Sequence, residues 1–120
     1  MREARSAQAG YQTDTSGYLY EQGLDELAAT GKLQKARSFF SQSHAAAVRS
    51  GHVDIQHLSR LRLCARGGAV DGLCRQAALR KSYDWLSRSG IPRFSLEAMW
   101  LWSQILVSCV QQYAAVTVMD

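Results

Sequence analysis

Gly31 separates two runs of residues with helical periodicity, and this feature constrains the fold more than any other. Apolar residues recur at helical spacing on both sides of it: Tyr20, Leu24 and Leu27 before it, and Leu33, Ala36 and Phe40 after it. Such spacing places each trio on one face of a helix. Glycine adopts the left-handed conformation at low cost, so Gly31 is expected to end the first helix. Because the join is so short, the second helix folds back on the first, and a helical hairpin is predicted.

The remainder of the chain is also predicted to be helical. The terminal residues 116–118 also suit a strand, but no other segment alternates apolar and polar residues with period two, and proline occurs once, at Pro92. We expect the fourth helix to direct Val70, Leu73, Cys74 and Ala77 inward, and Ser95 to cap the last helix. Residues 1–16 lack periodicity and are predicted to form a flexible tail before a single helical domain over 17–118. The expected helices cover about 16–30, 32–50, 54–66, 70–88 and 95–118, with stops at Gly51, at Gly67-Gly68 and in the turn 89–93.

An internal repeat connects the first two predicted hairpins. A shift of 37 residues places Leu24 on Leu61 and Gly31 on Gly68, and both copies match G-x-[LV]-[QD]-x-[AL]. The first copy, residues 31–36 followed by Phe40, resembles the tetratricopeptide repeat, and the resemblance covers residues 17–88. It implies a solenoid of helical hairpins that binds a protein or peptide in a groove. The predicted fold is therefore all-α with antiparallel helical hairpins, either a solenoid fragment of this type or an irregular five-helix bundle.

The net charge of +4 is unevenly distributed. Residues 31–93 hold twelve Lys and Arg against three Asp, whereas both ends of the chain are mildly acidic. A basic field of this kind recruits acidic partners, although a solvated surface without a partner has the same composition. Nucleic-acid binding through this basic belt is the alternative function, and a steep loss of affinity with salt would distinguish it.

Sequence signatures of catalysis or cofactor binding are absent. The chain contains no phosphate-binding glycine loop, no nucleophile elbow and no histidines at zinc spacing, so neither a metal nor a cofactor is predicted and the chain is not expected to be an enzyme. Cys64 lies seven residues from His57, but no orienting acid or oxyanion donor accompanies them. The three cysteines, Cys64, Cys74 and Cys109, include no C-x-x-C, so they are expected to be reduced core residues in a cytoplasmic or nuclear protein.

A protein-interaction module or adaptor is the predicted function. Trp100 and Trp102 point about 200° apart on a helix that carries no Lys or Arg beyond Ser95. That helix is too interrupted by polar residues to span a membrane, and we expect it to mediate self-association or to dock on a partner subunit in a larger complex. A protein or acidic peptide is the expected partner. The candidate partner-binding residues are Tyr20, His57, Arg60, Arg62, Arg66, Trp100 and Trp102.

Overall fold

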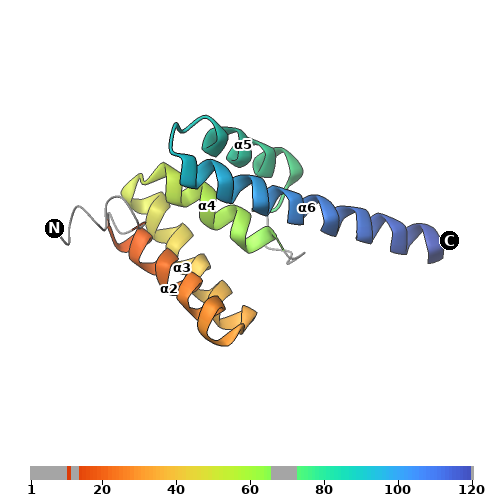
Figure 1. Cartoon of the computed structure of the whole chain (residues 1–120), viewed down its shortest axis with the longest axis horizontal. Coiled ribbons are helices and arrows are strands. Elements are labelled where there is room, and N and C mark those ends of the chain that lie inside the picture. Colours follow the sequence, from red (N-terminus) through yellow and green to blue (C-terminus); the bar gives the residue numbers. More distant parts are fainter. Residues whose placement is uncertain (1–10, 12–13, 66–72, 120) are drawn as a thin grey trace. The chain divides into compact units, whose positions relative to one another are not determined.

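The computed structural model describes residues 11, 14–65 and 73–119, with side chains as far as Val107. Five helices occupy the described residues, and none of these residues lies in a strand (Figure 1). The prediction of an all-α fold is confirmed. The helices are α2 (Thr15–Thr30), α3 (Leu33–Ser50), α4 (Val53–Cys64), α5 (Gln76–Ser87) and α6 (Pro92–Met119).

The chain divides into two compact units, Met1–Ser59 and Arg60–Asp120, called unit 1 and unit 2 below. The boundary falls within α4, so this helix begins in unit 1 and its last turn belongs to unit 2. Each unit is described by itself. The predicted flexible tail lies largely outside the described residues, and the predicted helix stop at Gly67-Gly68 lies entirely outside them.

In unit 1, α2 and α3 form the predicted hairpin. The carboxylate of Asp14 caps α2 by accepting a hydrogen bond from the Gly17 N–H at 3.2 Å. Gly31 ends α2 in the left-handed conformation with φ 67°, and its N–H donates to the Leu27 carbonyl at 3.0 Å. Gly51 ends α3 in the same way with φ 73°. Both predicted glycine stops are confirmed.

The buried face of α2 is displaced by one position from the predicted stripe. Gly23 is buried, whereas Leu24 and Leu27 are only partly so. A Cβ atom at Gly23 would come within 2.5 Å of the Phe40 ring, so α2 and α3 approach closely because this position has no side chain. Tyr20 is fully buried beside it, with its ring centroid 5.3 Å from that of Phe40. The core of the hairpin thus combines a small residue with two aromatic rings.

In unit 2, α5 and α6 pack against each other, but both helices begin elsewhere than predicted. Helix α5 starts at Gln76, so Leu73 and Cys74 lie in the preceding turn and Ala77 is exposed. Helix α6 starts at Pro92, where the missing N–H of proline costs no helical hydrogen bond. Ser95 is therefore not a cap, and its hydroxyl hydrogen bonds to the Leu86 carbonyl at 3.2 Å. Helix α5 thus begins later than the repeat predicts, and the second copy of the repeat motif lies almost entirely outside the described residues.

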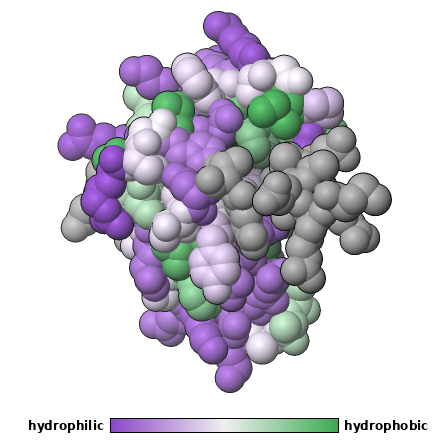
Figure 2. All heavy atoms as spheres, turned by 90° about the vertical axis from the view of Figure 1, so that its left-hand side faces the viewer, coloured by the Kyte–Doolittle hydropathy of each residue, from purple (hydrophilic) through white to green (hydrophobic). Residues whose placement is uncertain are grey.

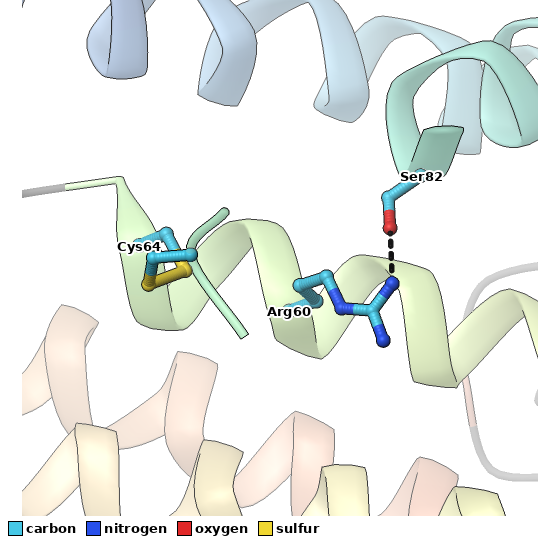
Figure 3. Close-up of a disulfide and its surroundings, with 4 residues drawn as sticks. Arg60, Cys64 and Ser82 are labelled. Atoms are coloured by element: carbon cyan, nitrogen blue, oxygen red, sulfur yellow. Dashed lines mark hydrogen bonds between the residues drawn. A yellow bond between two sulfur atoms is a disulfide. The ribbon is translucent and has the colours of Figure 1, made fainter. Parts of the chain in front are cut away.

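A disulfide joins Cys64 to Cys74, so the prediction that both are reduced core residues is wrong (Figure 3). The bond ties the end of α4 to the turn before α5, across ten positions of sequence. A protein disulfide persists in oxidising compartments, so the cysteines no longer support a cytoplasmic or nuclear location. Separately, none of the helices within the described ranges has an apolar stretch long enough for a bilayer.

Candidate functional site

One face of α6 exposes a row of large apolar side chains. Each is between 47 % and 65 % exposed, and their spacing of i, i+3, i+4, i+10 and i+11 confines them to one side of the helix. The opposite side of α6 carries the buried residues Phe94, Ala98, Leu101 and Ile105. The helix is thus apolar on two faces, of which one is covered. The exposed face, called the α6 stripe below, consists of Leu96, Met99, Trp100, Leu106 and Val107.

Arg62 holds the most prominent residue of the α6 stripe in place. Its guanidinium donates to the Glu97 carboxylate from Nη2 at 2.9 Å and from Nε at 3.3 Å. Both side chains of this ion pair are largely buried. The same guanidinium lies 5.5 Å from the ring centroid of Trp100, within the range of a cation–π interaction. One face of the Trp100 ring therefore rests on a fixed cation, while half of its surface remains exposed.

Trp102 packs against α5, away from the α6 stripe. Its ring stacks on Tyr83 with a centroid distance of 5.2 Å and an interplanar angle of 21°. Trp102 is only partly exposed. The prediction that the two tryptophans serve different sides of the helix is consistent with these contacts. Trp100 remains a candidate contact residue, whereas Trp102 contributes to the packing of unit 2.

Arg60 belongs to the contacts within unit 2. Its Nη1 donates to the Ser82 hydroxyl of α5 at 3.2 Å, and Ser82 is fully buried (Figure 3). Burial lowers the pKa of the Arg60 guanidinium from its ordinary value. Arg60 and Arg62 thus both engage residues of their own unit, and Arg66 lies outside the described residues. Nucleic-acid binding through the basic belt stays a prediction, with Arg60 and Arg62 each hydrogen bonded within unit 2.

Tyr20 and His57 lie in the interior, although the sequence placed them along a binding groove. Tyr20 has no exposed surface, and His57 is 9 % exposed. Tyr20 instead packs between Tyr11, whose ring centroid is 4.9 Å away, and Phe40. The solenoid interpretation assigned both residues to an open concave surface, and the structure gives them core positions instead.

A polar cluster at the start of α2 was missed by the sequence analysis. Asp14 accepts hydrogen bonds from Ser16 and, at 2.8 Å, from Ser50, while its Oδ1 lies 3.2 Å from Nδ1 of His52. Burial raises the pKa of Asp14, but these hydrogen bonds and that from Gly17 outweigh it and hold the pKa well below its usual value. The Ser16 hydroxyl also faces Nδ1 of His52, at 3.3 Å. In a catalytic triad, the serine and the acid contact opposite nitrogens of the histidine ring. Here Ser16 and Asp14 both face Nδ1 of His52, so we assign this cluster to helix capping.

The exposed large apolar residues outside the α6 stripe are spread over different segments: Tyr18, Val48, Val53, Trp85 and Ile91. The face shown in Figure 2 is mainly hydrophilic, with hydrophobic side chains in small separate groups. Isolated apolar residues are common on protein surfaces, whereas contiguous ones mark interfaces. Within the described residues, no group of three or more His, Cys, Asp or Glu side chains is placed to hold a metal ion.

Comparisons with known proteins assign no family to this arrangement: no family model, no curated protein and no solved structure matches the chain.

Proposed function

We propose that this chain is a protein-interaction module and that the α6 stripe is its contact surface. The observation that carries the proposal is the exposure of five large apolar side chains on one face of a helix whose other face is already buried. Leaving that much contiguous apolar surface in water is unfavourable, and burial against a partner removes the cost. The expected partner is a protein that offers an apolar groove to α6.

The geometry of the stripe suits recognition of a helix in a groove. Anchors in such complexes recur at i, i+3, i+4 and i+7 along one face, and Leu96, Met99 and Trp100 follow this spacing. Arg62 holds the Trp100 ring before any partner arrives. A side chain ordered in advance loses less conformational entropy on binding, so Trp100 is the expected centre of the interface.

The tetratricopeptide resemblance supports the same class of function through the first hairpin alone. There, the small residue Gly23 receives the aromatic Phe40, the type of close contact that the resemblance implies. The second copy departs from the pattern because α5 begins at Gln76 instead of near Val70. We therefore place partner binding on α6 and not in a groove between repeats.

Substitution of the stripe tests the proposal. We expect Met99→Asp combined with Leu106→Asp to abolish binding of an apolar dye and to release any partner that the immobilised wild-type chain captures from native extract. Val48→Asp is the matched control, because Val48 on α3 is 52 % exposed but lies outside the stripe. Dye binding and capture that survive the double substitution, or that fail equally in the control, would contradict the proposal.

A further inference from the structure

The outer face of α5 combines positive charge with an exposed tryptophan. Lys81, Trp85 and Arg88 are spaced i, i+4 and i+7, which places them in one row, and Arg80 lies beside that row. The three cations are exposed, and Trp85 is 49 % exposed. Asp84 contributes the single carboxylate of this face. These residues, Arg80, Lys81, Trp85 and Arg88, are called the basic face below.

The outer face of α2 has the opposite character. Tyr18, Glu21 and Asp25 are spaced i, i+3 and i+7, so they too form one row. Tyr18 is 50 % exposed, and Asp25 is exposed. Glu26 is already engaged by Lys35 at 3.8 Å, and α2 contains no Lys or Arg. Tyr18, Glu21 and Asp25 are called the acidic face.

We propose that these two faces bind each other between copies of this chain, the acidic face of one copy docking on the basic face of the next. The basic face carries three cations against the Asp84 carboxylate, and the acidic face carries two carboxylates. Each also includes one exposed aromatic ring, so the two faces match in kind and are opposite in net charge. Both faces lie on well-formed helices, so neither needs to become ordered on binding. The occupant of the basic face is therefore a second copy of this chain.

Charge also decides the symmetry of the contact. Two basic faces repel each other, as do two acidic faces, so a two-fold contact through either face alone is unfavourable. The contact must therefore join unlike faces. Where each copy uses its two faces on different neighbours the contact is head-to-tail, and each of the two end copies of an open assembly retains one unused face. Head-to-tail contacts generate a ring when the rotation closes and an open chain when it does not. The inference concerns residues outside the α6 stripe, so it does not depend on the function proposed above.

Sedimentation of the full chain at low and high salt gives the first test. Exposed charge pairs are screened strongly as ionic strength rises. We expect species larger than a monomer that grow with protein concentration at about 0.05 M salt and dissociate at about 0.5 M salt. A wild-type chain that remains monomeric at about 0.05 M salt across the accessible concentrations would overturn the inference.

Complementary variants give the sharper test. One variant carries Lys81→Glu and Arg88→Glu, which removes the basic face, and the other carries Glu21→Lys and Asp25→Lys, which removes the acidic face. We expect each variant alone to be monomeric, with helix content unchanged by circular dichroism. Mixed together, they retain one intact face of each kind and should form a 1:1 dimer that grows no further. A mixture that stays monomeric while the wild type assembles would overturn the inference.

Two controls separate this contact from other uses of the same surfaces. Met99→Asp alters the α6 stripe and should leave salt-sensitive assembly unchanged, so assembly lost only in that variant would refute the head-to-tail contact while supporting the proposed function. A fluorescent single-stranded oligonucleotide tests the nucleic-acid alternative. If the oligonucleotide binds the wild type, if Lys81→Glu with Arg88→Glu abolishes that binding, and if no self-assembly occurs, then the basic face serves nucleic acid and the inference is wrong.

Discussion

The α2–α3 hairpin and helix α6 differ in how much of their apolar surface is buried. In the hairpin, Tyr20, Phe40 and Ala36 are essentially inaccessible to water, because Gly23 lets the two helices meet closely. In α6, Leu101 and Ile105 are buried, but Met99 and Trp100 on the other side are about half exposed. The exposed large apolar side chains of the hairpin, Tyr18 and Val48, lie on separate helices, whereas α6 exposes five along one face. Interaction surfaces are recognised by such an excess, and not by apolar content alone.

The close approach at Gly23 offers the most severe way to disturb the packed region. Gly23→Val should lower the free energy of unfolding by about 3 kcal/mol, because its side chain collides with the Phe40 ring in a closely packed core. Urea denaturation followed by circular dichroism measures the change. Ala29→Val, at an exposed position on the same helix, is the control and should cost much less. Equal losses in the two variants would mean that helix propensity and not packing sets the cost.

The disulfide stabilises the other region, and its removal should affect unit 2. Breaking the Cys64–Cys74 bond is expected to cost about 2–3 kcal/mol, because the closed loop restricts the unfolded chain. Thermal unfolding with and without a reducing agent measures this difference. The double variant Cys64→Ser with Cys74→Ser should melt like the reduced wild type and should not respond to the reductant. A melting temperature that is the same in both conditions would contradict a structural role for the bond.

The hairpin shows which features could be predicted from the sequence and which could not. The hairpin was predictable because Gly31 and Gly51 are local signals that end helices by their own conformational freedom. The buried side of α2 could not be predicted, because Leu24 is more apolar than Gly23. Only the contact with Phe40 shows that the small residue is the buried one.

In unit 2, the sequence was less informative because its contacts are not local. The Cys64–Cys74 pair follows no motif spacing, and the partner of Arg62 lies 35 residues away at Glu97. The excess apolar surface of α6 was visible in the composition of the helix, including Trp100 and Met99. Which side of the helix would be covered depended on Phe94 and Leu101, whose burial needs the three-dimensional packing.

Removal of the Asp14 cap of α2 should cause a smaller, pH-dependent loss of hairpin stability. Asp14→Ala should cost about 1 kcal/mol at neutral pH, as is typical for loss of an N-cap side chain. The folded-state pKa of Asp14 is depressed, so the ionised carboxylate contributes stability above the unfolded-state value of 3.8, and the contribution declines as pH falls below it. The folded-state pKa lies so far below its usual range that most of the contribution is still present at pH of about 3, and the gap between the melting curves of wild type and Asp14→Asn should only begin to narrow below pH 3.8. A gap between the two proteins that is independent of pH would show that the carboxylate charge is unimportant.

The smallest effect on stability is expected where the apolar residue is exposed, and it tests the comparison most directly. Met99→Asp should change the free energy of unfolding by no more than about 0.5 kcal/mol, because the side chain is 54 % exposed. Leu101→Ala, two positions along the same helix, should cost about 2–5 kcal/mol because Leu101 is 1 % exposed. Chemical denaturation of both variants in parallel gives the two values. If Met99→Asp costs as much as Leu101→Ala, the outer side of α6 is covered in the folded chain, and the α6 stripe is not available to a partner. If the two values separate as expected, the apolar surface of Met99 serves neither folding nor solubility, and binding remains the physical reason for its presence.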